Sequence, residues 1–185
     1  MVRIALDFDG VITHTVPAMV RYASAHFGLA LTEAECVSLS ARVQLDEAGY
    51  RRLIRETHET EYALTFEPTE GVADTLAELS DSHELLILTS RSGASLVRAE
   101  EWLVAHRLRD HFVDVVHGAA GTKAAAAERL GLDLLLDDRP YNLMGFEREA
   151  RAVLWTTSYN ADDVIPDRCT RVRSWAEFVG LVSQI

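Results

Sequence analysis

The sequence is poor in cysteine and contains a single lysine. Its two cysteines, Cys36 and Cys169, are far apart and fit no metal-ligand spacing. A disulfide framework is unusual in a chain of 185 residues, so we expect a reducing compartment. The 18 basic residues comprise 17 arginines and Lys123. A coding bias toward arginine accounts for this ratio, but it does not explain why one position kept lysine.

Long apolar runs and positive charge are also scarce. No run approaches the roughly 18–20 apolar residues of a membrane span. The first residues, MVRIALDFDG, lack a secretory apolar region because Asp7 and Asp9 interrupt it. Eighteen basic against 29 acidic residues give a net charge of −11, which repels nucleic acids and anionic membranes. We therefore expect a cytoplasmic protein with no nucleic-acid or membrane partner, in which a few local groups bind any phosphate.

The composition, with 48% hydrophobic and 25% charged residues, is typical of a globular protein. Five short apolar runs predict strands. The runs are nearly continuous, which is typical of strands covered on both faces of a parallel sheet. They lie at residues 2–8, 84–90, 112–118, 132–138 and 152–158. Stretches with helical periodicity lie at residues 71–81, 93–107, 122–131 and 174–182. This alternation predicts an α/β, Rossmann-like core of three layers, with a five-stranded parallel sheet ordered third, second, first, fourth, fifth.

The interval from about Thr13 to Glu67 breaks this alternation. It contains no strand-like run, its pattern is helical throughout, and Thr32 and Glu35 have capping-box spacing. Pro68 ends the interval because proline biases the preceding residue out of a helix. We expect a small all-helical cap at residues 13–67, inserted after the first strand of a core that comprises residues 1–12 and 68–185.

Polar side chains follow three of the predicted strands. Ligands of open parallel sheets bind in the crevice beyond the carboxyl ends of the strands, so residues distant in sequence should converge there. The residues concerned are Asp7, Asp9, Thr89, Ser90, Asp137 and Asp138. Their convergence predicts one polar site at this edge of the sheet.

The charge at this site predicts a metal ion. Four carboxylates without partners would repel one another, and Mg²⁺, which prefers oxygen ligands, resolves the repulsion and leaves a position for a substrate phosphate. Lys123 is a compact charge that can neutralise both the carboxylates and a phosphate oxygen. Thr89 and Ser90 add donors, and Gly10 lets backbone N–H groups approach the ligand closely. Together these residues would provide a nucleophilic carboxylate, a second carboxylate, a metal site and a group of donors that bind an anion.

Other catalytic and nucleotide-binding motifs are missing from the sequence. It contains no G-x-S-x-G element and no Ser-His-Asp arrangement in a recognisable context. It also has no G-x-x-x-x-G-K-[ST] or G-x-G-x-x-G loop, which excludes the usual nucleoside triphosphate and dinucleotide sites.

Four elements together resemble the motifs of the haloacid dehalogenase superfamily, in that family's order. They are DFDGVI at 7–12, LLILTSR at 85–91, Lys123 and LLLDDRP at 134–140. The resemblance covers most of the chain outside the cap. It implies a phosphoryl-transfer enzyme, because an aspartate stands two residues after Asp7.

The resemblance also implies roles for the site residues. Asp7 would attack phosphorus and form an aspartyl-phosphate, and Asp9 would protonate the leaving oxygen and then activate water. Asp7, Asp137, Asp138 and the backbone carbonyl of Asp9 would surround Mg²⁺, with Asp138 orienting the metal shell or pairing with lysine. The phosphoryl oxygens would be held by Thr89, Ser90, Lys123 and the Gly10 loop.

Four segments look similar to the 5′(3′)-deoxyribonucleotidase branch of this superfamily. They are EPTEGVADTLAEL, the LLLDDRP stretch, AVLWTTSYN and RVRSWAEFVGLV. The cap, which would form the leaving-group pocket, departs from that branch. Its aromatic residues could stack on a base, but we favour packing within the cap for most of Tyr22, Phe27, Tyr50, Tyr62 and Phe66. For Arg91 and Arg139 we favour surface salt bridges, and for His14 a solvated loop.

The function expected from the sequence is a Mg²⁺-dependent phosphomonoesterase for a small phosphorylated metabolite, with a (deoxy)nucleoside monophosphate as one candidate. One alternative is a phosphomutase resembling β-phosphoglucomutase. Another is a catalytically inert binding protein of the same fold, although the intact motifs argue against it. A signalling receiver domain also uses an acid pair, Thr or Ser, and Lys. Its acid pair comes early in the chain, whereas Asp137 and Asp138 come last here.

Overall fold

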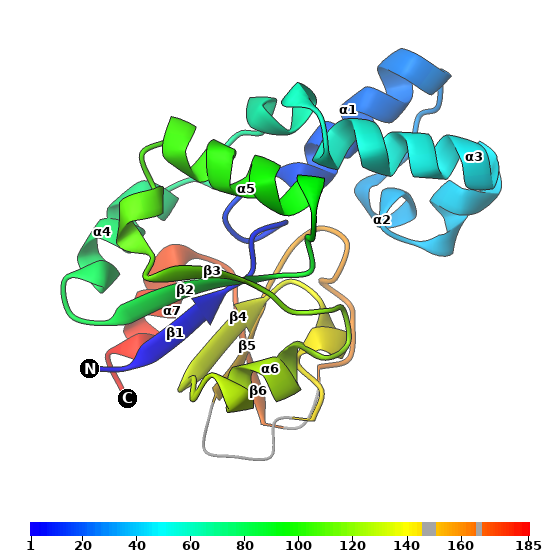
Figure 1. Ribbon diagram of the computed structural model, residues 1–185. Helices are drawn as coiled ribbons and strands as arrows, with labels where there is room; N and C mark the ends of the chain where they lie inside the picture. Colours follow the sequence, from blue (N-terminus) through cyan, green and yellow to red (C-terminus); the bar gives the residue numbers. More distant parts are fainter. Residues whose placement is uncertain (146–150, 166–167) are drawn as a thin grey trace.

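A parallel six-stranded sheet forms the centre of the computed structural model, which describes residues 1–145, 151–165 and 168–185 (Figure 1). Along the sheet the strand order is β3-β2-β1-β4-β5-β6. The strands are β1 (Arg3–Leu6), β2 (Glu84–Thr89), β3 (Asp114–His117), β4 (Leu134–Asp137), β5 (Arg151–Trp155) and β6 (Cys169–Val172). All five pairings are parallel, so the predicted fold class and the order of the first five strands are confirmed.

The predicted number of strands was wrong by one, because β6 was missed. It pairs with β5 at the edge of the sheet, and only Val172 among its four residues is buried. By contrast, the central strand β1 buries Ile4, Ala5 and Leu6 completely. An edge strand covered on one side needs no continuous apolar run, so the pattern that identifies the buried strands does not identify β6.

Helices cover both faces of the sheet. One face packs against α4 (Val72–Ser80), α5 (Ala94–Ala105) and α7 (Trp175–Val182), through residues such as Leu76, Trp102 and Phe178. The other face packs against α6 (Lys123–Arg129), through Ala126 and Ala127. Figure 1 shows α5 and α6 on opposite sides of the sheet. Two short 3₁₀ turns complete this part of the chain, η2 (Arg109–His111) and η3 (Pro140–Asn142).

The chain between β1 and α4 is helical, and we call its helices the helical insert. They are α1 (Thr15–Phe27), α2 (Glu33–Cys36), α3 (Leu39–His58) and the 3₁₀ turn η1 (Glu61–Thr65). They bury a small core of their own, which includes Leu31, Cys36 and Leu53. The capping box of Thr32 and Glu35 starts α2. In Figure 1 the blue and cyan helices of the insert project beyond one end of the sheet.

Helix α3 is bent at Asp46, which has φ 54° and ψ 176°. The Asp46 carboxylate accepts a hydrogen bond of 2.8 Å from the backbone N–H of Gly49. That contact caps the second half of α3 in the manner of a helix N-terminus. The bend therefore sets the direction of the segment that carries Tyr50, Ile54 and His58.

Both cysteines are free, with Cys36 buried and Cys169 half-buried. Among the described residues, no helix is both long and apolar enough to cross a membrane.

Candidate active site

The carboxyl ends of three adjacent strands bring the predicted site residues together. Asp7 follows β1, Thr89 ends β2 and Asp137 ends β4, and β1 lies between the other two strands. The backbone N–H of Asp7 donates to the carbonyl of Leu136, which fixes the first strand against the fourth. A cavity of about 270 Å³ opens here, lined by Asp7, Asp9, Ser90 and Asp138 together with residues of α1 and α3.

Three buried carboxylates form the floor of the site. Asp7, Asp137 and Asp138 each place an oxygen within 4.8 Å of the other two. Burial, together with the neighbouring aspartates and against the attraction of Lys123, raises the pKa of Asp7 well above its usual range. Burial also raises the pKa of Asp138 to about 7, although Arg139 opposes the shift. Three crowded carboxylates that offer only oxygen donors fit a hard divalent cation such as Mg²⁺.

Lys123 is the buried counter-charge of this cluster. Its Nζ lies 2.7 Å from an oxygen of Asp7 and 2.7 Å from an oxygen of Asp137, and the residue is only 1% exposed. Burial alone would lower the pKa of Lys123, but the two carboxylates outweigh it and raise the pKa above its ordinary value. The only lysine of the chain is therefore charged and held between two predicted site residues.

Asp9 has different partners. Its carboxylate accepts two hydrogen bonds from the Arg91 guanidinium, of 2.7 and 2.9 Å, and one of 2.6 Å from the Thr15 hydroxyl. Burial works to raise the pKa of Asp9, but Arg91 and Thr15 outweigh it and hold the pKa well below its usual range. Asp9 is thus ionised, and Arg91 and Thr15 orient its carboxylate. This carboxylate does not belong to the cluster of three described above.

The interpretation of Arg91 as a surface salt bridge was wrong. Arg91 is only 4% exposed, and its guanidinium lies 4.9 Å from the ring centre of Phe8 and 5.8 Å from that of Phe66. Arg139 does form an ion pair, at 3.4 Å, but its partner is the buried Asp138. Each arginine lies two residues after the last residue of a strand that carries a site motif, and this position was a signal that sequence reasoning could have used.

Thr89, Ser90 and Gly10 also lie at this end of the sheet. Thr89 is fully buried, and its hydroxyl accepts a 3.2 Å hydrogen bond from the backbone N–H of Arg91. Ser90 is exposed and lines the cavity. Gly10 has φ 80°, and a Cβ on it would lie 2.6 Å from an oxygen of Asp138. This position therefore requires glycine for its conformation and for close packing against the carboxylate.

Sequence reasoning missed three polar residues, buried or half-buried, that hold Asp137 and Asp138 at the end of β4. The amide of Asn142 donates to both oxygens of Asp137, at 3.0 and 3.1 Å. The Tyr159 hydroxyl donates to the Asp138 carboxylate, and the Asn160 amide donates to the Asp138 backbone carbonyl at 2.7 Å. Both asparagines belong to Tyr-Asn pairs that follow strands, but nothing in the sequence indicates what these pairs contact.

The aromatic residues of the insert mostly pack on one another, which confirms the packing interpretation for them. The ring centres of Tyr22 and Tyr62 are 5.0 Å apart, those of Tyr62 and Phe66 are 6.1 Å apart, and those of Tyr22 and Phe27 are 6.2 Å apart. Tyr50 differs, because it lines the cavity above the carboxylates. His14 is exposed, as expected for a solvated loop residue.

His58, at the end of α3, is a further cavity residue that sequence reasoning missed. Its Nδ1 lies 2.8 Å from the Thr57 hydroxyl and 3.1 Å from the Ile54 carbonyl. Burial, assisted by the nearby charge of Arg91 and opposed by Asp9, lowers the pKa of His58 to about 4. The insert thus presents a neutral imidazole to the site at neutral pH.

Several solved structures share this fold. A haloacid dehalogenase-like hydrolase from Streptococcus pneumoniae is similar with a TM-score of 0.71 and 17% identity, over 98% of each chain. A predicted phosphatase from Clostridium acetobutylicum has a TM-score of 0.69 and 16% identity, over 99% of this chain and 98% of that one. A predicted phosphoglycolate phosphatase from Haemophilus somnus also has a TM-score of 0.69 and 16% identity, over 97% and 96%.

No curated protein matches the chain in sequence. The family model described as "5′ nucleotidase, deoxy (pyrimidine), cytosolic type C protein" matches residues 1–185, the whole length of the chain. That match agrees with the fold of the solved relatives and with the site at the carboxyl ends of the strands. The chain therefore belongs to this 5′ nucleotidase family, and it is a phosphatase of the haloacid dehalogenase superfamily.

Proposed function

We propose that the protein is a Mg²⁺-dependent phosphomonoesterase that hydrolyses a small phosphorylated metabolite through an aspartyl-phosphate on Asp7. A (deoxy)nucleoside monophosphate is one candidate substrate, in keeping with the family to which the chain belongs. The observation that carries the proposal is the position of Asp7. Its carboxylate lies in a buried acidic cluster, bound to Lys123, at the base of a cavity that Asp9 also lines.

In this proposal Asp7, Asp137 and Asp138 hold the metal ion, and Asn142 and Tyr159 orient two of these carboxylates. When bound, Mg²⁺ offsets the charge of the carboxylates and of the phosphoryl group. Lys123, which already contacts Asp7, contributes a further positive charge, and Thr89, Ser90 and the Gly10 loop supply donors to the phosphoryl oxygens. Together these groups stabilise charge spread over the transferred phosphoryl group.

The proposed reaction has two steps. First, an oxygen of Asp7 bonds to phosphorus while the bond from phosphorus to the leaving oxygen breaks, and Asp9 gives that oxygen a proton. Next, Asp9 takes a proton from water, the water oxygen bonds to phosphorus, and the Asp7–phosphorus bond breaks to release phosphate. The ion pair with Arg91 keeps Asp9 ionised, which suits the second step. The first step requires that the approach of the leaving group loosens this pair, so that Asp9 takes up a proton from solvent before it protonates the leaving oxygen.

We further propose that residues 13–67 act as a cap on a core of residues 1–12 and 68–185. The insert contributes Tyr50, Ile54 and His58 to the cavity wall, so its movement would open the site and exclude bulk water when closed. Ser158, in the loop after β5, donates a hydrogen bond to Glu33 of α2 and so holds the insert near the core. A cytoplasmic location is in keeping with the cytosolic type in the family description.

Phosphate release from a panel of phosphomonoesters tests this function. The panel contains 5′- and 3′-deoxynucleotides, ribonucleotides, sugar phosphates and phosphoglycolate, each assayed with and without Mg²⁺. We expect release that requires Mg²⁺, is greatest on a nucleotide and falls at least 10³-fold in Asp7→Asn, in which the nucleophile is lost.

Greatest phosphate release from another ester would support the mechanism and contradict the assignment of a nucleotide as the substrate. Release that Asp7→Asn leaves unchanged would contradict the mechanism, and an isomerised sugar phosphate in place of free phosphate would indicate a mutase.

A further inference from the structure

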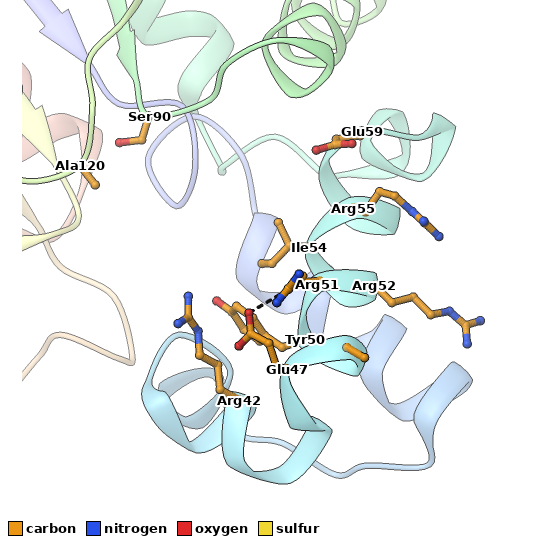
Figure 2. Close-up of a pocket in the computed structure, with 11 residues that line it drawn as sticks. Arg42, Glu47, Tyr50, Arg51, Arg52, Ile54, Arg55, Glu59, Ser90 and Ala120 are labelled. Carbon is orange, nitrogen blue, oxygen red and sulfur yellow. Dashed lines mark hydrogen bonds and ion pairs between the residues drawn. The ribbon is translucent and has the colours of Figure 1, made fainter.

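A second cavity adjoins the catalytic one and runs along the helical insert. It has a volume of about 1210 Å³ and lies between α3 and the core loops that carry Ser90 and Ala120 (Figure 2). The two cavities share four lining residues, Tyr50, Ile54, Ser90 and Ala120. A leaving group attached to a phosphoryl group at Asp7 would therefore extend past Tyr50 into this second cavity.

The second cavity is locally basic, although the protein carries a net charge of −11. Four of the 17 arginines line it, together with two glutamates: Arg42, Arg51, Arg52, Arg55, Glu47 and Glu59. Arg55 also forms an ion pair with Glu56, so the arginines exceed these three glutamates by one charge. Such a local excess within an acidic surface favours binding of an anion at this place.

The four arginines are not equivalent. In Figure 2, Arg42 points into the gap toward the core, whereas Arg52 and Arg55 project to the opposite side of α3. Arg51 forms a 2.9 Å ion pair with Glu47, and both side chains are largely exposed. An exposed pair of this kind is weak, so an anion can compete for Arg51.

Arg42 is exposed and has no carboxylate partner in the described part of the chain. Its guanidinium lies 4.8 Å from the ring centre of Tyr50, a cavity residue. Stacking on the ring occupies the face of the guanidinium and leaves its N–H donors at the edge free. A planar fork of donors oriented in this way matches the oxygens of a phosphate group.

We propose that the preferred substrate is a bisphosphate, in which one phosphate reacts at Asp7 and a second phosphate on the leaving group binds Arg42. Arg51 joins the contact when its exposed pair with Glu47 opens. The assignment rests on the proposed phosphomonoesterase function, and it adds a specificity-determining subsite on the insert.

Matched pairs of substrates test the subsite. The pairs are deoxyadenosine 5′-monophosphate with deoxyadenosine 3′,5′-bisphosphate, and glucose 6-phosphate with glucose 1,6-bisphosphate. In at least one pair, we expect kcat/KM of the bisphosphate to exceed that of the monophosphate by about tenfold or more, the effect of one charge-assisted contact. In Arg42→Gln the two kcat/KM values should become about equal, chiefly because the KM for the bisphosphate rises. Arg42→Lys should recover only part of it.

Arg52→Gln is the matched control, since this arginine borders the same cavity but points away from the gap. It should leave the preference at its wild-type value. Equal kcat/KM values within both pairs would overturn the proposal while the phosphatase function stands. An equal loss for both members of a pair in Arg42→Gln would overturn it too.

A binding measurement separates this proposal from the proposed function. Deoxyadenosine 3′,5′-bisphosphate and glucose 1,6-bisphosphate are titrated calorimetrically into Asp7→Asn and into Asp7→Asn with Arg42→Gln. We expect the double variant to bind the bisphosphate that is preferred in the assay about tenfold more weakly than Asp7→Asn does. If no ester is hydrolysed, the same difference is expected for at least one of the two bisphosphates. This result would support the subsite even if no ester is hydrolysed, in which case the phosphatase function fails alone. Equal affinities would overturn the subsite.

Discussion

Lys123 shows why one position of an arginine-rich chain holds lysine. Its ammonium group lies 2.7 Å from both Asp7 and Asp137, in a place that is almost completely buried. A compact charge on a slender stem can reach between two carboxylates, whereas a planar guanidinium is wider and needs a fork-shaped partner. The shape of the site, and not only its charge, therefore selects the residue.

Replacing Lys123 with methionine should affect both stability and activity. The change leaves a buried carboxylate pair without its counter-charge, so the free energy of unfolding without Mg²⁺ should fall by about 3–5 kcal/mol. Added Mg²⁺ should restore part of this loss, and the phosphatase rate should fall by about 10²–10³-fold. Urea unfolding and phosphate release check these effects. The exposed Arg129→Met on the same helix is the control, and an unchanged stability of Lys123→Met would contradict the account.

The charged residues that the structure gathers at the candidate site could be predicted from the sequence, but the polar residues that hold them in place could not. Asp7, Asp9, Asp137 and Lys123 occur in motifs at the ends of strand-like runs, so the sheet topology alone brings them together. Asn142 and Tyr159 contact the carboxylates only through the path of two loops. No periodicity or motif encodes those paths, because they follow from tertiary packing.

At the scale of elements, the bend in α3 is the feature on which the insert depends. Asp46 adopts a conformation that residues other than glycine rarely adopt, and its carboxylate caps the second half of the helix. This half carries Tyr50, Ile54 and His58 to the cavity. The bend therefore connects local backbone geometry to the wall of the site.

Substituting Asp46 with alanine should destabilise the insert. The strained backbone angle is kept while the cap to Gly49 is lost, so the free energy of unfolding should fall by about 1 kcal/mol. Chemical denaturation measures this change. Asp46→Asn keeps an acceptor at the same place and should lose only a few tenths of that amount. Equal losses in the two variants would show that the cap is not the cause.

The strands differ in how far they can be predicted from sequence. β1, β2, β4 and β5 are buried on both faces and appear as continuous apolar runs. β6 escapes prediction because only Val172 of its four residues is buried, and its pairing with β5 decides its conformation. The insert could be recognised as helical, but its kink, and hence the direction of Tyr50, depends on one backbone angle at Asp46.

At the scale of the whole molecule, His58 links the helical insert to the core. It belongs to α3, and the charges nearest to it, Arg91 and Asp9, belong to the core. Burial and Arg91 lower its pKa to about 4, whereas an unfolded histidine has a pKa of about 6.5. Because the unfolded chain then binds more protons between these values, protonation favours unfolding in this range.

The stability of the protein should therefore depend on His58 in mildly acidic solution. Between about pH 6.5 and 4, the contribution of His58 to the free energy of unfolding should decrease as the pH falls, whereas the raised pKa values of Asp7 and Asp138 act in the opposite direction. The free energy of unfolding of His58→Gln, measured relative to the wild type, should therefore increase as the pH falls through this range. Urea unfolding at a series of pH values measures both slopes. His14→Gln, at an exposed position, is the control and should follow the wild type. Parallel curves for His58→Gln and the wild type would contradict this role.

The way in which the insert joins the core has a wider consequence. Thr13 pairs with Asp9 on one side and with Pro68 on the other, so the chain leaves and re-enters the core at one place. A segment attached through such a narrow neck can be lengthened, shortened or exchanged without shifting any strand of the sheet. Under the proposed function, evolution can therefore vary the choice of leaving group through the insert while the residues at the ends of the strands are inherited unchanged.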